Sequence, residues 1–240
     1  MRFSIPSPTL LLTSMLLTET LGYSSTDNGR QNVGPSPAKV SGARRAFLIN
    51  SFSILPALAP VANAFDNRLD EKYLDVTPSI GPQPSDLGVS ERVSKTKGTY
   101  IGLKPCSATT TNCYCSSAPF EDSPARYVPS WGGGSIKDVK KVIDTYEVGQ
   151  NNIDGGGFKT VQFDEEKQYL YVQFQSYKAG YIDDFECWYN PESSRFDVRS
   201  ASRLGMSDLG VNGKRLEYVG TRLEKEFGWS LKRRKSGKLV

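Results

Sequence analysis

Between Phe158 and Ala201 the sequence reads FKTVQFDEEKQYLYVQFQSYKAGYIDDFECWYNPESSRFDVRSA. Aromatic and β-branched residues alternate with polar residues in four runs, 158–163, 168–176, 181–188 and 195–201. Short segments rich in charged residues, glycine, asparagine or proline separate these runs and are typical of turns. Period-2 runs at this spacing predict the strands of an antiparallel meander.

Two amphipathic segments predict helices beside this sheet. The first begins at Ser135, where Ser-x-x-Asp resembles a capping box, and extends to about residue 147. Its apolar face carries Val139, Val142, Ile143 and Tyr146. The second is expected to be capped by Asn212 and to end near Gly228, with Leu216, Val219, Leu223 and Phe227 on one face. The expected fold is therefore α+β, an antiparallel β-sheet with helices packed against it.

Several common active-site patterns are missing from the sequence. The chain has no histidine, which removes serine–histidine and cysteine–histidine triads and histidine proton shuttles. The glycine run 132–134 lacks the Gly-Lys-Ser/Thr ending of a phosphate-binding loop, so we interpret it as a hinge. No residue is assigned a catalytic role.

The first 64 residues resemble three targeting signals in series. Residues 1–22 combine an early basic residue with a short apolar run, as in a secretory signal peptide. Residues 23–43 are acid-poor and contain several serines, as in a plastid transit peptide, although a plain linker would have a similar composition. Residues 44–64 begin with Arg44-Arg45, continue with an apolar stretch over 47–61 and end in the small-residue cleavage pattern Ala62-Asn63-Ala64, as in a twin-arginine signal.

This series resembles the leaders of thylakoid-lumen proteins of algae whose plastids have extra envelope membranes. It predicts a plastid thylakoid location, with the lumenal side favoured and the stromal side as the alternative. Cleavage before Phe65 would leave 176 residues with 25 basic and 24 acidic side chains, so most of the basic excess belongs to the leader. This balance gives no support for nucleic-acid binding.

The remainder divides into three parts by composition. Residues 65–100 contain prolines and little periodicity and predict an extended arm. Residues 101–230 are expected to form a single globular domain. Residues 231–240 form a basic tail, which is either solvated or in contact with anionic lipid or an acidic partner.

The four cysteines are Cys106, Cys113, Cys115 and Cys187. They could form two disulfides in three connectivities, and a lumenal location permits oxidation, so we expect at least one bond. The spacing Cys-x6-Cys-x-Cys does not match the usual zinc ligands, and Cys-x-x-Cys is missing. We therefore expect no metal and no cofactor.

Two long motifs resemble a known family. The first comprises Lys104-Pro105-Cys106-Ser107 and TNCYCSS at 111–117; the second is VRSASRLGMSDLGVN at 198–212, supported by YIDDFE at 181–186. Over residues 103–223 the chain resembles the family known as domain of unknown function 1499, which implies no biochemical activity. Two departures are the third cysteine, Cys115, and Gly213, which stands where the family favours a basic side chain.

The second motif carries the candidate site. We expect Arg199 beside Asp183 and Asp184 on the neighbouring strand, and bidentate pairs of this kind would clamp sheet to helix. The alternative is an anion site formed by Arg199, Arg203 and Arg215. Adjacent strand residues point to opposite faces, so Asp183 and Asp184 should not converge on one atom. The candidate residues are Asp183, Asp184, Arg199, Ser200, Ser202, Arg203, Asp208, Asn212 and Arg215.

These observations lead to one expected function and one alternative. We expect a non-catalytic thylakoid protein that serves as an accessory or assembly subunit of photosystem I or II. Its partners would be photosystem subunits, with peripheral membrane contact and no nucleic acid. The alternative is a redox, anion-binding or lipid-binding lumenal enzyme or module that uses the Arg/Ser/Asp motif.

Overall fold

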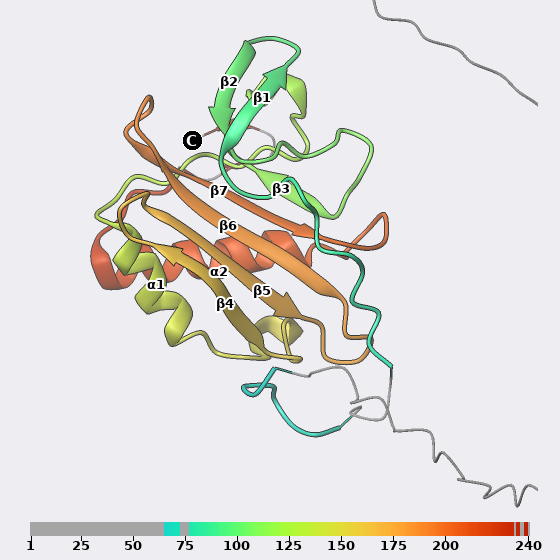
Figure 1. Ribbon diagram of the computed structural model, residues 1–240. Coiled ribbons are helices and arrows are strands. Elements are labelled where there is room, and N and C mark those ends of the chain that lie inside the picture. Colours follow the sequence, from blue (N-terminus) through green and yellow to red (C-terminus); the bar gives the residue numbers. More distant parts are fainter. Residues whose placement is uncertain (1–64, 73–76, 233, 236–237, 240) are drawn as a thin grey trace, which may run out of the picture. The chain divides into compact units, whose positions relative to one another are not determined.

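The computed structural model describes residues 65–72, 77–232, 234–235 and 238–239 (Figure 1). Its strands are β1 (Ser90–Ser94), β2 (Gly98–Gly102), β3 (Cys113–Cys115), β4 (Phe158–Asp164), β5 (Tyr169–Gln175), β6 (Ile182–Asn190), β7 (Arg195–Ser202), β8 (Arg234–Lys235) and β9 (Lys238–Leu239). Its helices are α1 (Ile136–Asp144) and α2 (Val211–Phe227), with short 3-10 turns at Phe120–Asp122 and Gln150–Asn152. The three predicted targeting signals lie outside the described residues.

A five-stranded antiparallel sheet forms the centre of the domain. Its order is β3-β7-β6-β5-β4, so the four predicted runs pair as a meander and the short strand β3 extends it beyond β7. β3 was not predicted because three residues are too few to show a period. The expected α+β class, with an antiparallel meander and helices packed against it, is confirmed.

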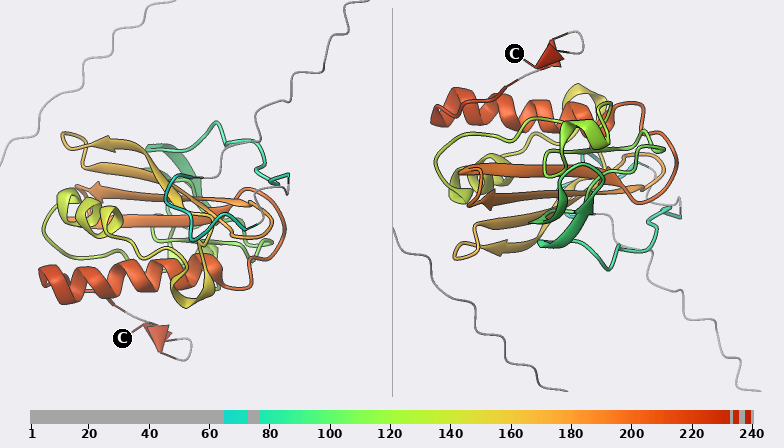
Figure 2. Two further views of the ribbon diagram at one scale, coloured as in Figure 1. Left: turned by 90° about the horizontal axis from the view of Figure 1, so that it is seen from below. Right: turned by 90° about the horizontal axis from the view of Figure 1, so that it is seen from above.

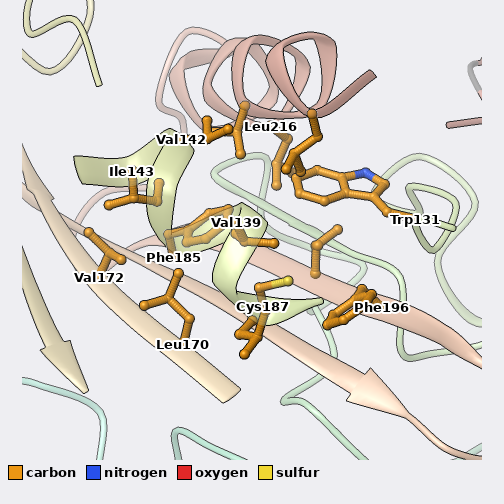
Figure 3. Packing of buried hydrophobic residues seen from close by; sticks show 14 of the residues in the cluster. Trp131, Val139, Val142, Ile143, Leu170, Val172, Phe185, Cys187, Phe196 and Leu216 are labelled. Atoms are coloured by element: carbon orange, nitrogen blue, oxygen red, sulfur yellow. The ribbon is translucent and has the colours of Figure 1, made fainter. Parts of the chain in front are cut away.

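Both helices pack against the same face of this sheet (Figure 2). α1 begins with the predicted capping box, in which Ser135 and Asp138 bind each other's backbone amides, and it ends at Asp144, a turn earlier than expected. The main core lies between helices and sheet, and Figure 3 shows α1 and α2 side chains meeting the strand residues. Members of this core include Val139, Val142, Ile143, Leu170, Val172, Phe185, Cys187, Phe196, Val219 and Leu223.

The start of α2 differs from the prediction. Gly210 is the cap residue, in a left-handed conformation, and Asn212 lies fully buried inside the first turn. Asp208 supplies the capping contacts instead, because its carboxylate accepts hydrogen bonds from the backbone amides of Gly210 and Asn212. The end at Gly228 agrees with the prediction.

The glycine run before α1 allows a close contact. A Cβ atom at Gly133 would lie 1.9 Å from the ring of Trp229, and Gly132 exchanges two backbone hydrogen bonds with Ser230. The glycine run therefore joins the chain after α2 to the segment before α1. The sequence analysis predicted a hinge at this run and did not predict this contact.

The opposite face of the sheet is covered by the segment before β3. Leu103 and the half-buried Leu87 pack against Tyr169, Tyr171 and Trp188. The antiparallel hairpin of β1 and β2, which the sequence analysis did not predict, lies at the end of the predicted extended arm and continues to Gly102. In the basic tail, β8 pairs with β9.

Candidate functional site

The acidic residues of β6 project from both faces of the sheet. Asp183 points toward α2, whereas Asp184 and Glu186 point toward the face covered by the arm, as shown by their ion-pair partners. This alternation follows from the two-residue period of a strand. Each carboxylate meets a different arginine, so the strand distributes three negative charges among three buried ion pairs.

Arg215 is the centre of the pair on the helix side. It projects from the first turns of α2, is fully buried, and contacts both Asp154 and Asp183. Its Nη2 lies 2.7 Å from Asp183 Oδ2, and its Nε lies 2.9 Å from Asp154 Oδ2. Nη1 donates to Ser200 Oγ at 2.9 Å and to Asn212 Oδ1 at 2.7 Å. Every nitrogen of the guanidinium is therefore hydrogen-bonded to another part of the fold.

The surroundings of Arg215 favour its charged form. Burial lowers the pKa of this guanidinium, but Asp154 and Asp183 outweigh burial and raise the pKa above its ordinary value. Burial raises the pKa of Asp183, and Arg215 opposes that change. The guanidinium also lies 4.6 Å from the centre of the Phe174 ring, a cation–π contact.

Arg203 binds Asp184 on the other face of the sheet. Its Nε lies 3.0 Å from Asp184 Oδ2 and its Nη2 lies 2.8 Å from Oδ1, a two-point contact between planar groups. Tyr171 donates to Asp184 Oδ1 and accepts from Arg203 Nη2 at 3.1 Å. Both charged side chains are at least 95% buried.

Arg199 pairs with Glu186 rather than with the two aspartates named in the sequence analysis. Arg199 and Glu186 are direct neighbours in the register of β6 and β7, and Arg199 Nη1 lies 3.2 Å from Glu186 Oε2. The expectation that Arg199 lies beside Asp183 and Asp184 was wrong, because the register places Ser202 opposite Asp183 and Ala201 opposite Asp184. Glu186 also accepts hydrogen bonds from Tyr169 and from the backbone amide of Gly88.

The remaining candidate residues connect these pairs to the loop before α2. Ser200 Oγ lies 2.6 Å from Asn212 Oδ1, and Asn212 Nδ2 donates to Ser202 Oγ at 3.0 Å and to Asp208 Oδ2 at 2.8 Å. Asn212 therefore crosslinks the end of β7 to the start of α2 instead of capping the helix.

This arrangement satisfies its own charges. The three arginines meet four carboxylates, those of Asp154, Asp183, Asp184 and Glu186, so the set carries one excess negative charge. An anion would have to displace a carboxylate that already binds the guanidinium, at a site with no positive excess. The geometry supports a clamp that holds the loop and α2 against the sheet.

The cysteines form one disulfide among the described residues. Cys106 and Cys113 are joined with their Cα atoms 5.6 Å apart, which confirms the expectation of at least one bond. The second bond that four cysteines would allow is not formed, because Cys115 and Cys187 are free and buried. Cys187 points into the main core and Cys115 lies 3.0 Å from Ser117 Oγ, and burial raises the pKa of both thiols.

The described residues contain no group of three or more histidine, cysteine or carboxylate side chains that could hold a metal ion. Within the same part of the chain, none of the helices combines the length and the apolar character that crossing a membrane requires.

The sequence analysis missed Asp154 and the three tyrosines that complete the clamp. Tyr146 donates to Asp154 at 2.6 Å, as Tyr169 and Tyr171 donate to Glu186 and Asp184. Asp154 lies in a loop with a positive φ of 57°, and its neighbours in the sequence are two asparagines, Ile153 and three glycines, which show no period. The sequence could have indicated two of the tyrosines, because Tyr169 and Tyr171 are two positions apart in a predicted strand and therefore lie on the same face of the sheet.

Comparison with known proteins gives a single kind of match. Curated proteins and solved structures show no significant similarity to the chain. One family model, described as protein of unknown function (DUF1499), matches residues 102–223, from the end of β2 to the last turns of α2. The matched segment contains Arg199, Arg203, Arg215 and all four of their carboxylate partners, and it is slightly more than half of the sequence, so this chain belongs to the DUF1499 family.

Proposed function

We propose that this protein is a non-catalytic accessory or assembly subunit of a photosynthetic complex at the thylakoid, on the lumenal side. The single observation that supports the non-catalytic part is the internal use of the arginines. Arg199, Arg203 and Arg215 are all buried and each binds a carboxylate of β6, so the most distinctive motif of the chain stabilises the fold.

The location is supported by the leader sequence. The series of signals over residues 1–64 predicts passage through a secretory step, the plastid envelope and the thylakoid membrane. A small α+β domain delivered to that compartment with its charged motif occupied internally would act through its surface. Photosystem subunits are the partners that we expect there.

Fractionation of the native protein tests this proposal. Thylakoids solubilised in mild detergent and separated on a native gel should carry the protein in the same band as photosystem I or photosystem II subunits. Its first residue, determined by sequencing the protein from that band, should be Phe65. Migration only as a free small protein would refute the subunit role, and a retained leader would refute the lumenal location.

Replacing Arg203 with alanine distinguishes a subunit from an enzyme. If the protein is a non-catalytic subunit, the variant should be less thermally stable. The amount found in the complex should then fall only as far as the amount of folded protein falls. Loss of a metabolite conversion at unchanged stability would instead identify Arg203 as part of a reactive site.

A further inference from the structure

Three of the four cysteines lie together beside β3. Cys113 and Cys115 are two positions apart in this strand, so their side chains point to the same face of the sheet. Cys106, which is bonded to Cys113, belongs to the same buried cluster, together with Ala201. Cys115 is buried in this cluster with a free thiol. A thiol packed beside a disulfide can exchange with it, because a thiolate attacks a disulfide sulfur directly.

The segment that leads to Cys106 runs alongside Cys115. The thiol of Cys115 lies 3.5 Å from the carbonyl oxygen of Lys104, two residues before Cys106. Cys106 and Cys115 also border the same cavity, whose volume of about 10 Å³ is near the size that one water molecule needs. Only a narrow space therefore separates the two side chains, and this space leaves room for a change of side-chain rotamer.

Burial raises the pKa of the Cys115 thiol, and hydrogen bonds oppose that change. Ser117 donates its backbone amide to Cys115 Sγ at 3.3 Å, and the Ser117 hydroxyl lies 3.0 Å from the same sulfur. Arg199 is the neighbour of Cys115 in the register of β3 and β7 and favours the thiolate, whereas Asp197 disfavours it. The other titratable side chains that interact with this thiol are Tyr100 and Tyr127. The thiolate is therefore a minor form at neutral pH, and exchange should be slow there and faster in alkaline solution.

From these contacts we infer that Cys106, Cys113 and Cys115 form a disulfide switch, in which Cys106 is bonded either to Cys113 or to Cys115. In the exchange, the thiolate of Cys115 attacks Cys106 Sγ and forms the new sulfur–sulfur bond. The bond between Cys106 and Cys113 breaks, and Cys113 leaves as a thiolate that takes up the proton released by Cys115. One disulfide and one thiol are present before and after the step, so it requires no oxidant or reductant. This inference is independent of the proposed photosystem role.

Cys106 is a better target for the Cys115 thiolate than Cys113. Residues two positions apart in a strand have Cα atoms about 6.4–6.8 Å apart, at the upper limit of the distance that a disulfide spans. A bond between Cys113 and Cys115 would therefore distort β3, which pairs with β7 at both positions. Cys106 lies in the segment before β3 and outside the sheet, so a bond from Cys115 to Cys106 leaves the strands paired.

The position of the bond determines how firmly the segment before β3 holds the end of β7. Asn112 precedes Cys113, and its carbonyl oxygen accepts a hydrogen bond from the Ser202 amide at 2.9 Å. The bond in the structure closes a ring from Cys106 to Cys113 that ends next to Asn112. Moving the bond to Cys115 removes this anchor, so the contact between Asn112 and Ser202 should open more often.

Peptide mapping of the full chain tests the switch, because Tyr114 separates Cys113 from Cys115 and is a cleavage site for chymotrypsin. The folded protein is incubated at about pH 8.5, where more of the thiol is ionised, and is then unfolded at about pH 6 with N-ethylmaleimide to block its thiols. After cleavage, molecules that have exchanged should keep the fragments on both sides of Tyr114 joined, with Cys113 blocked. These joined fragments should increase with incubation time and should be absent from the C115S control.

Two results of this mapping would overturn the switch. The first is that no joined fragments form in the folded native chain. The second is that joined fragments form with Cys106 blocked, since this result assigns the new bond to Cys113 and Cys115.

The C113S variant provides a second measurement, because only the second pairing is open to its cluster. Oxidised glutathione should join Cys106 to Cys115 in this variant and release two molecules of reduced glutathione. Hydrogen exchange of the Ser202 amide, followed by NMR, should then be about tenfold faster than in C115S, which keeps the bond to Cys113. The Phe196 amide, which donates to Trp131 O at 2.8 Å, should exchange equally in both variants. A folded C113S protein without the new disulfide would overturn the pairing, and equal exchange at Ser202 would overturn its effect on β7.

Discussion

Arg203 and Asp184 meet through two parallel hydrogen bonds, with Nε to Oδ2 at 3.0 Å and Nη2 to Oδ1 at 2.8 Å. Arg203 follows directly after β7, and Asp184 lies near the start of β6, so the pair ties the first residue of the β7–α2 loop to the middle strand of the sheet. Tyr171 on β5 binds both members. A single buried contact therefore joins three strands of the sheet and the start of the β7–α2 loop.

Replacing Arg203 with alanine should lower the free energy of unfolding by about 3–5 kcal/mol, because it leaves the Asp184 carboxylate buried without its partner. Urea denaturation followed by circular dichroism measures this change. The control is Lys97→Ala, which breaks an ion pair with Glu192 whose two side chains are 54% and 62% exposed. That surface pair should contribute less than about 1 kcal/mol.

A double replacement distinguishes two causes of the lost stability, the unpaired buried charge of Asp184 and the lost packing of the Arg203 side chain. The R203M/D184N protein has neither charge, so it should be more stable than R203A although it lacks the same ion pair. An R203A protein as stable as the native chain would contradict the clamp.

The disulfide assignment predicts a definite thiol count. The folded protein should show no rapidly reacting thiol, because Cys115 and Cys187 are buried, and the unfolded protein should show two. After reduction the unfolded chain should show four. Four reactive thiols without reduction would contradict the Cys106–Cys113 bond. Removing this bond by C106S/C113S should lower stability by about 2–3 kcal/mol, as expected for a short closed loop.

Gly133→Ala should be strongly destabilising. The new methyl group would lie 1.9 Å from the Trp229 ring, so the contact between the α1 entrance and the chain after α2 must open. We expect the free energy of unfolding to fall by about 1–3 kcal/mol, the usual range when an added group overlaps a packed side chain. Thermal unfolding measures it, and near-ultraviolet circular dichroism of the tryptophans should report the displaced ring.

Gly213→Ala should increase the stability of the protein, in contrast to Gly133→Ala. Gly213 lies inside α2, where a Cβ would approach the Tyr114 ring at an ordinary 3.4 Å. Alanine is favoured over glycine in a helix interior by about 0.8–1 kcal/mol, so the variant should unfold at a higher temperature. A lower unfolding temperature would mean that Tyr114 cannot accommodate the methyl group.

Much of the fold could be predicted because local patterns specify it. The runs that became β4 to β7 alternate clearly, and the capping box at Ser135 fixed the start of α1. The start of α2 was misassigned because Asn212 and Asp208 are both good cap residues in the sequence, and only the structure shows that Asp208 binds the amides. The β1–β2 hairpin was not predicted, because its strands are mostly polar and exposed and show no clear alternation.

The candidate site could be predicted only in part, because its pairs depend on strand register. The motif pointed to Arg199, Arg203 and Arg215, and Arg215 and Arg203 do contact Asp183 and Asp184. The partner of Arg199 depends on how β6 and β7 align, and no local pattern fixes that alignment to one residue. Asp154 is 61 residues away from Arg215 and lies in a loop without periodicity, so no sequence pattern joins them.

The buried tyrosines predict that stability falls at alkaline pH. Burial raises the pKa of Tyr100 to about 12, and burial together with nearby carboxylates raises the pKa values of Tyr146, Tyr169 and Tyr171 above their ordinary value of 10. Above pH 10 the unfolded chain loses these protons while the folded chain keeps them. The unfolded state then binds fewer protons, so raising the pH favours unfolding, by about 1.4 kcal/mol per pH unit for each tyrosine.

Urea midpoints measured between pH 8 and pH 11 should therefore be flat up to about pH 9.5 and then fall steeply. Tyr100→Phe removes one of the titrating hydroxyls and should reduce the slope above pH 10 by about 1.4 kcal/mol per pH unit. Absorbance at about 295 nm, which follows tyrosinate, should rise together with unfolding for the buried rings. A midpoint that stays constant through pH 11 would show that these hydroxyls ionise without unfolding the domain, which the contacts of Tyr169 with Glu186 and of Tyr171 with Asp184 make energetically unfavourable.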